Sequence, residues 1–258
     1  MSAAASEATV EVEREGALGR IWLNRPDVMN AISIELGTEL TRALDDLSGD
    51  SEVSVIVIRG RGGNFCVGGD FDEVQRLREG GPDALMPLFD RFGAACALIA
   101  EIEVPVVAVV EGFAMAGGFE LMAAVDISVV SSEAVMADNH VRYGQIPGGG
   151  GSQRFPRAVG MHRAMGHMLT GDRLRGQQAV DWGLAYRCFP AETFDEDVAD
   201  FLAALAGHRR DALCGIKTLI RTGAAMPLAH GLAAERDAVV AHIGGEAGAS
   251  GVDAFARR

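Results

Sequence analysis

The sequence has few cysteines, and they form no pattern that would bind a metal or build a disulfide framework. Cys66, Cys96, Cys188 and Cys214 are scattered over 258 residues without a CxxC pair. Zinc sites and small disulfide-bonded domains both depend on paired or clustered cysteines. We therefore expect free, mostly buried thiols in a reducing compartment, with no disulfide and no metal.

Long apolar runs, a leader-like N-terminus and an excess of positive charge are also missing. No stretch approaches the roughly 20 uncharged apolar residues that cross a bilayer. The first residues, MSAAASEATV, lack the basic and apolar regions of a secretory signal. With 23 Lys and Arg against 36 Asp and Glu, the net charge is −13, which disfavours a broad surface for nucleic acid or anionic membrane. We expect a cytoplasmic protein that binds neither.

The glycine-rich stretches complete none of the common phosphate-binding or nucleophile motifs. The chain contains no GxxxxGK[ST] and no GxSxG, and Gly60, Gly62 and Gly63 do not make a GxGxxG. Such motifs place backbone N–H groups against phosphates, or present a serine nucleophile at a strand-to-helix turn. Their absence argues against a nucleotide-dependent enzyme and against an α/β-hydrolase.

Buried strands alternate with helices through the first half of the chain. Apolar and β-branched runs predict strands at 10–13, 20–24, 53–58, 104–110 and 127–130. Apolar residues at helical spacing predict helices at 34–47, 71–78 and 83–102. Ser33 is the expected N-cap of the first of these helices. This alternation is typical of an α/β domain.

After residue 137 the pattern becomes mainly helical. One short strand is expected at 184–188, and helices are expected at 161–169, 176–181, 192–206, 211–223, 227–242 and 248–256. The segment 189–191 is the best candidate for a linker. We therefore divide the chain into a core with the site, residues 1–190, and a C-terminal helical region, residues 191–258.

The most informative stretch runs from 104 to 124, where a buried strand is followed by a glycine turn and a helix. Gly117 and Gly118 open this helix, and Glu120 lies in its first turn. A helix start offers unpaired N–H groups, and glycine lets a negatively charged oxygen approach them closely. An acid beside such groups suits proton transfer next to an enolate. The alternative is that the glycines serve close packing and that Glu120 only complements the helix dipole.

Six segments resemble, in order, the signatures of the enoyl-CoA hydratase/isomerase (crotonase) superfamily. They are NRPDVMNA (24–31), GNFCVGGDF (63–71), EGFAMAGGFELMAAVDI (111–127), GQIPGGGGSQRFPRAVG (144–160), LTGDRLRGQQAVDWGLAYR (169–187) and AFARR (254–258). The resemblance implies an α/β fold, a right-handed spiral of ββα units with a C-terminal helical region that forms a homotrimer or a dimer of trimers. It also implies an acyl-CoA thioester as the substrate, with coenzyme A as part of that substrate and no other cofactor.

The resemblance further implies the residues of the active site. Two backbone N–H groups polarise the thioester carbonyl in the family, and the matching residues are Gly69 and Gly117. Hydratases of the family also use two glutamates, of which Glu120 matches the first while His140 occupies the position of the second. Histidine is a competent acid or base, because its unperturbed pKa is about 6.5. We expect Glu120 and His140 to orient one water that adds across the α,β double bond.

His140 leaves other interpretations open. One alternative is that His140 is a loop histidine without a catalytic role. A second is that Asp138 replaces it as the acid, and a third is that Glu120 alone moves a proton in a Δ3,Δ2-enoyl-CoA isomerase. In a further alternative His140 serves a β-diketone C–C hydrolase, which needs no coenzyme A. A non-enzymatic RNA binder is disfavoured by the acidic composition.

Contacts with coenzyme A are implied at Val28, Ala31, Val67, Asp70, Phe71, Phe255 and Arg258. The last two match positions that reach the coenzyme A of a neighbouring subunit. Asp70 is also the expected cap of the following helix. At the position where the family commonly has a lysine, this sequence has Asp72, so one contact with a phosphate of coenzyme A is lost. Arg25 is the candidate to replace that contact. The acyl chain is expected against the 71–100 region, including Phe89.

Overall fold

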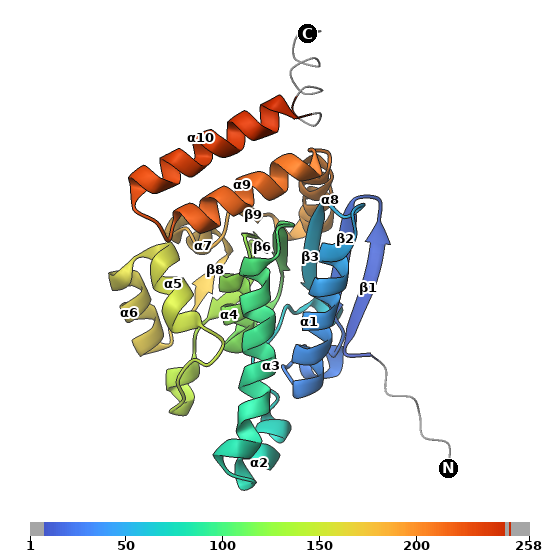
Figure 1. Ribbon diagram of the computed structural model, residues 1–258. Helices are drawn as coiled ribbons and strands as arrows, with labels where there is room; N and C mark the ends of the chain where they lie inside the picture. The colour runs from blue at the N-terminus through green and yellow to red at the C-terminus, as the bar shows by residue number, and fades with distance from the viewer. Residues whose placement is uncertain (1–7, 246–247, 249–258) are drawn as a thin grey trace.

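A six-stranded sheet forms the centre of the protein, whose computed structural model describes residues 8–245 and 248 (Figure 1). The strand order is β1-β2-β3-β4-β6-β9, with β1 and β2 antiparallel and every other neighbouring pair parallel. The strands are β1 (Val10–Glu15), β2 (Leu18–Leu23), β3 (Val55–Gly60), β4 (Val106–Val110), β6 (Ile127–Ser131) and β9 (Arg187–Phe189). The middle strands are almost wholly apolar because both faces of the sheet are covered.

A smaller second sheet lies beside the first. It consists of β5 (Phe113–Met115), β7 (Val135–Ala137) and β8 (Leu174–Arg175), in that order. After β4 the chain adds β5 to this sheet and then forms α4 (Gly117–Ala124), and after β6 it adds β7. Each such turn gives one strand to each sheet, as expected of ββα units. The sequence analysis missed β5, β7 and β8, because two or three residues are too few for an alternating pattern.

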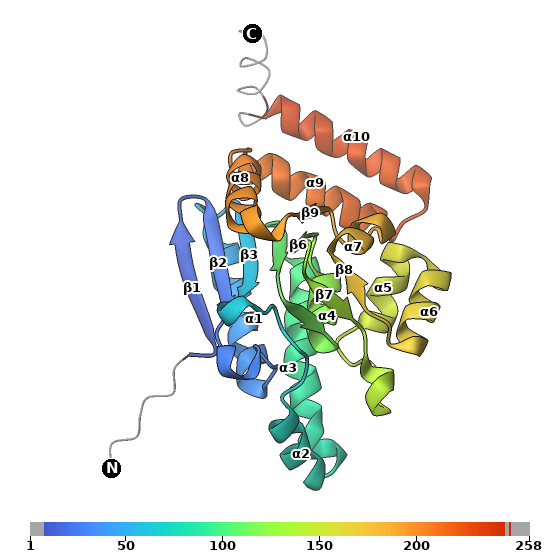
Figure 2. The same ribbon diagram turned by 180° about the vertical axis from the view of Figure 1, so that it is seen from behind.

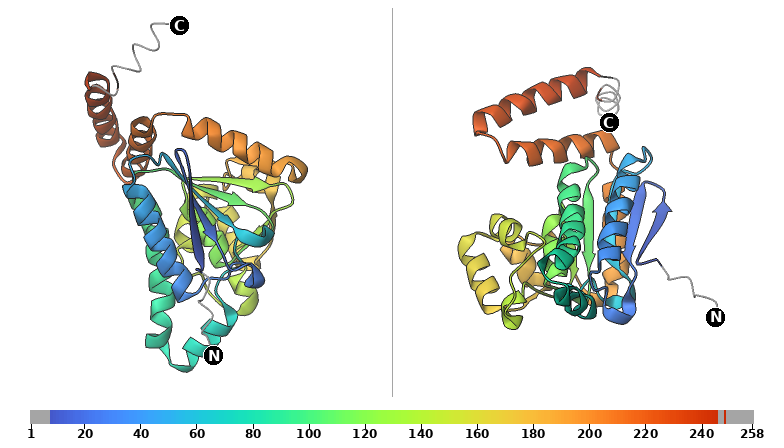
Figure 3. Two further views of the ribbon diagram at one scale, coloured as in Figure 1. Left: turned by 90° about the vertical axis from the view of Figure 1, so that its right-hand side faces the viewer. Right: turned by 60° about the horizontal axis from the view of Figure 1, so that its bottom comes forward.

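Helices cover both faces of the large sheet. On one face α1 (Ile34–Gly49) lies beside α3 (Pro82–Glu101), and α2 (Phe71–Glu79) precedes α3 (Figure 3). Ser33 caps α1 as predicted, because its hydroxyl oxygen accepts from the N–H of Leu36 at 3.0 Å. On the other face α8 (Phe194–Ala206) packs Val198 and Leu202 against β3 and β4, and it lies in front of the sheet in Figure 2.

Residues 8–209 also contain three further helices and four short 3-10 helices. The helices are α5 (Gly151–Val159), α6 (Met161–Thr170) and α7 (Gly176–Trp182). The 3-10 helices are η1 (Pro26–Val28), η2 (Arg61–Gly63), η3 (His140–Tyr143) and η4 (Ala191–Thr193). The strand expected at 184–188 begins later, at Arg187, because Leu184 and Ala185 are bonded to the end of α7 instead.

The last two described helices are α9 (Arg210–Gly223) and α10 (Leu228–Gly244), at the top of Figure 1. Lys217, the only lysine of the sequence, is 7% exposed and fixes α9 to the core. Its ammonium group contacts the carbonyl oxygens of Ile99 and Val104 and pairs with Asp126 at 2.8 Å. In contrast α10 packs on α9 and buries none of its residues in the single chain.

Two expectations about the chain concern membrane spans and the C-terminus. Among residues 8–245 no helix is long and apolar enough to cross a membrane. The helix expected at 248–256 lies outside the described residues, apart from Gly248.

Candidate active site

Glu120 is buried in the first turn of α4, where its side chain is 2% exposed. Its Oε1 accepts hydrogen bonds from the backbone N–H groups of Gly149 at 2.7 Å and Gly151 at 2.8 Å. Only glycine fits at position 149, because a Cβ there would lie 2.4 Å from the ring of Phe92 and 3.0 Å from Oε2 of Glu120. The glycine loop, which we define as residues 148–151, therefore holds one oxygen of Glu120 and leaves the other free to accept a proton.

This glycine loop is itself held by Arg154 on α5. The guanidinium group donates to the carbonyl oxygen of Gly149 at 2.7 Å and to that of Cys96 on α3 at 3.2 Å. Phe89 and Phe92, also on α3, lie against Gly148 and Gly149 of the loop. Phe89, expected near the acyl chain, is thus next to Gly148.

His140 lies at the start of η3, and its two ring nitrogens face two different carboxyl groups. Nδ1 is 2.6 Å from Oδ1 of Asp138, and Nε2 is 3.9 Å from Oε2 of Glu120. A carboxylate can only accept, so Nδ1 carries a proton and Nε2 is the atom that faces Glu120. The structure therefore brings Glu120 and His140 together, as the sequence analysis predicted.

Burial and charge change the acidity of both groups. Burial raises the pKa of Glu120, although the N–H groups of Gly151 and Gly149 and the charge of His140 oppose this effect. Burial by itself would lower the pKa of His140. The hydrogen bond and charge of Asp138, with the charge of Glu120, outweigh it, so the His140 pKa is raised. A raised carboxyl pKa gives a stronger base, and a raised imidazole pKa keeps the ring protonated closer to neutral pH.

Asp138 binds His140 through a hydrogen bond, whereas the sequence analysis considered Asp138 only as a substitute for His140 as the acid. It directly follows β7, is 1% exposed, and has His140 as its hydrogen-bond partner. Its second oxygen, Oδ2, is buried without a partner among the described residues. The signal in the sequence is the Asp-x-His spacing at the end of a short strand, and this spacing has meaning only once the strand is known.

Gly117 and Gly69 lie on two backbone segments that contact each other. Gly117 is the first residue of α4, so its N–H has no partner within the helix. Gly69 forms a parallel bridge with Ile32 in which its two neighbours make the hydrogen bonds, so the N–H of Gly69 points away from Ile32. A Cβ on Gly117 would lie 3.4 Å from the Cα of Gly68, which shows how closely the segments approach.

The turn before Gly117 is strained. Ala116 has φ 48° and ψ −116°, a conformation that residues with a side chain rarely adopt. Its N–H donates to the carbonyl oxygen of Ala137, and its own carbonyl accepts from the N–H of Glu120. These two bonds hold Ala116 in place and fix the entry of the chain into α4.

The residues expected to bind coenzyme A differ in exposure. Asp70 caps α2 as predicted, because Oδ1 accepts from the N–H of Glu73 at 3.0 Å. Its Oδ2 pairs with Arg25 at 2.8 Å, and Arg25 also donates to the carbonyl oxygen of Ala31. Arg25 is therefore engaged within the protein. Val28 and Phe71 are exposed, Val67 is half-buried and Ala31 is buried, whereas Phe255 and Arg258 lie outside the described residues.

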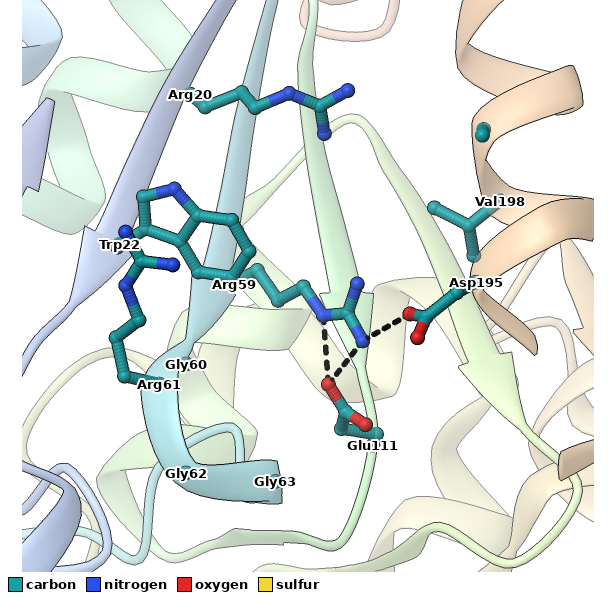
Figure 4. Close-up of a pocket in the computed structure, with 11 residues that line it drawn as sticks. Arg20, Trp22, Arg59, Gly60, Arg61, Gly62, Gly63, Glu111, Asp195 and Val198 are labelled. Atoms are coloured by element: carbon teal, nitrogen blue, oxygen red, sulfur yellow. Dashed lines mark hydrogen bonds and ion pairs between the residues drawn. The ribbon is translucent and has the colours of Figure 1, made fainter. Parts of the chain in front are cut away.

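Two clefts lie elsewhere on the molecule, and neither is lined by Glu120 or His140. One of them has a volume of about 550 Å³. Figure 4 shows this cleft, with Arg59 pointing between Glu111 and Asp195. Arg61 in the same cleft lies over the ring of Trp22, with its guanidinium carbon 3.9 Å from the ring centroid, and pairs with Glu11 and Glu13. Because these guanidinium groups are already paired with carboxylates, the cleft offers little free positive charge.

Proteins that this chain resembles in sequence and in fold include enoyl-CoA hydratases. The family model described as enoyl-CoA hydratase/isomerase matches residues 13–258. A probable enoyl-CoA hydratase from Rhizobium meliloti is 33% identical over 231 residues, which are 90% of this chain and 88% of that protein.

Two crystal structures of enoyl-CoA hydratases share the fold at TM-score 0.91. The one from Polaromonas sp. is 29% identical and covers 95% of this chain and 96% of its own. The one from Bacillus anthracis is 26% identical and covers 96% of each. The predicted fold class is thereby confirmed.

Proposed function

This chain belongs to the enoyl-CoA hydratase/isomerase family, and on that premise we propose that it adds water across the α,β double bond of an enoyl-CoA thioester. The observation that carries this proposal is the placement of Glu120 and His140. Their facing atoms are 3.9 Å apart, beyond a direct hydrogen bond, and one water can contact both. Hydration needs a base that takes a proton from the bound water and an acid beside it that delivers a proton to Cα.

The directions of the two pKa shifts assign a role to each group. Glu120, a carboxylate with a raised pKa, takes a proton from the water as its oxygen attacks Cβ. His140, kept protonated by Asp138, donates a proton from Nε2 to Cα. The sum is one water added, with its hydroxyl group on Cβ and a proton on Cα. After product release the proton gained by Glu120 passes to His140 through solvent, and both groups return to their starting states.

The negative charge that develops on the thioester oxygen needs hydrogen-bond donors. We assign this role to the backbone N–H groups of Gly69 and Gly117, in support of which neither has a partner within its own helix or bridge. Losing one such donor in other enzymes costs about 10²–10³ in rate. The strained backbone at Ala116, immediately before Gly117, fits a turn that is shaped for this purpose.

Binding of the coenzyme A part must rely on arginine and backbone groups. The only lysine of the sequence, Lys217 on α9, is buried. Asp72 is exposed at a position where the resemblance to the family leads us to expect a lysine, and Arg25 is paired with Asp70. We propose Val28, Ala31, Val67 and Phe71 as contacts. A homotrimer or a dimer of trimers belongs to the same proposal, and the unburied residues of α10 leave a surface for such contacts.

The pair of His140 and Asp138 favours a second candidate, a β-diketone C–C hydrolase. A histidine backed by a carboxylate is a common device for activating water towards a carbonyl carbon. This reaction would not need coenzyme A.

Two measurements separate these functions. A panel of enoyl thioesters of varied chain length, followed by loss of the conjugated absorbance, is expected to show turnover. Titration with coenzyme A, followed by the fluorescence of Trp22 and Trp182, is expected to show binding below millimolar concentration. Absence of both, together with cleavage of a β-diketone, would replace the hydratase by the hydrolase.

A further inference from the structure

His167 is a buried histidine on α6 that lies behind the acid–base pair. It is 2% exposed, and its Nε2 accepts a hydrogen bond from the backbone N–H of Asp138 at 3.1 Å. The same ring stacks on Phe119, with centroids 5.2 Å apart and an interplanar angle of 23°. Phe119 immediately precedes Glu120. One imidazole therefore contacts both chain segments that carry the proposed catalytic groups.

The hydrogen bond fixes the protonation state of this ring. A backbone N–H can only donate, so Nε2 of His167 must present its lone pair, and the proton of the neutral ring is on Nδ1. Phe155 and Trp182 also pack edge-on against the ring. Burial in these surroundings lowers the pKa of His167, although the charges of Asp138 and Asp172 oppose this. The surroundings thus favour the neutral form that the hydrogen bond needs.

We propose that His167 is a positioning residue for the reaction, because its Nε2 fixes the backbone of Asp138 and thereby the carboxylate that accepts the hydrogen bond from Nδ1 of His140. The inference rests on the proposed function for its kinetic part. Asp138 is held at two points, by its N–H to His167 and by its carboxylate to His140. Without the first bond the carboxylate loses its fixed place, and His140 loses the partner that keeps it protonated and aimed at Glu120.

Three substitutions of His167 distinguish the effect of its hydrogen-bond acceptor from the effect of its side-chain volume. His167→Gln places an amide oxygen near the position of Nε2 and keeps the acceptor. His167→Met has similar volume without a comparable acceptor. His167→Asn is polar but too short to reach the N–H of Asp138. We expect kcat to fall by about 10- to 10²-fold in the Met and Asn variants with little change in KM, and to stay close to the unmodified value in the Gln variant.

The decisive readout is the titration of the His140 ring by NMR, which needs no substrate. The charged groups facing that ring are Asp138 and Glu120. We expect the His140 pKa to fall in the Met variant and to be restored in the Gln variant. The Asn variant gives the same comparison if the Met variant does not fold. An unchanged His140 titration in the folded Met or Asn variant would overturn the inference.

The two proposals fail in different ways. A wild-type protein that hydrates no thioester contradicts the hydratase, while a shifted His140 titration in the Met variant still supports the positioning role. A loss of thermal stability with unchanged kcat and unchanged His140 titration would mean that His167 only packs the core, and would contradict the positioning role.

Discussion

Nε2 of His140 lies 3.9 Å from Oε2 of Glu120, although the two residues come from successive ββα units. Each is held from behind by a different group, Glu120 by the N–H groups of the glycine loop and His140 by Asp138. The two side chains thus have fixed positions before any substrate binds. This preorganisation allows specific predictions about rate and pH.

The rate of hydration is expected to depend on pH with two limbs. It falls as pH rises through the raised pKa of His140, because the imidazolium proton is lost, and it falls as pH drops through the raised pKa of Glu120, because the base is protonated. Asp138→Asn removes the charge that keeps His140 protonated, so the alkaline limb should move to lower pH. Profiles of kcat/KM for both proteins test this. An alkaline limb that stays in place would contradict the role of Asp138.

Gly149→Ala should damage the site through crowding. The new Cβ would lie 2.4 Å from Phe92 and 3.0 Å from Oε2 of Glu120. We expect kcat to drop by about 10²-fold, because displacements of about 1 Å have that effect. Gly166→Ala is the matched control, since nothing lies within 4 Å of a Cβ at that helical position. Equal kinetics for the two variants would show that the loop does not hold Glu120.

The fold and the site could be predicted to different extents. Long apolar strands and the capped helix after Ser33 follow from local pattern, and so does a glutamate placed just after a glycine turn. The pairing of Asp138 with His140 could not be found, because the Asp-x-His spacing has meaning only once the three-residue strand β7 before it is known. The burial of Lys217 was equally hidden, since two carbonyl groups and Asp126 from distant segments make its site.

Lys217→Met should reduce stability without affecting the site. The substitution removes two hydrogen bonds and one ion pair from a buried position, while Asp126 keeps Arg221 as a partner. We expect the free energy of unfolding to fall by about 2–4 kcal/mol, measured by urea denaturation. The kcat of the folded variant should be unchanged. A variant as stable as the unmodified protein would mean that the polar contacts of Lys217 do not hold α9.

Asp72→Lys should strengthen the binding of coenzyme A. The side chain at this position is exposed at the start of α2, next to Phe71 and two residues beyond the Asp70 cap. Replacing a negative charge by a positive one near the proposed phosphate contacts should lower KM for the thioester by up to about fivefold, the scale of an exposed ion pair. Glu79→Lys, at the far end of α2, is the charge control. Equal KM values for the two variants would place the phosphates elsewhere.

The central claim is that Glu120 and His140 act together on one water. The most direct test is a double-mutant cycle of Glu120→Gln and His140→Gln, with kcat measured for hydration of a crotonyl thioester. We predict that each single variant loses about 10²–10⁴ in kcat and that the double variant loses hardly more, because either change disables the shared water. Single variants that keep full activity, or losses that multiply in the double variant, would contradict the claim.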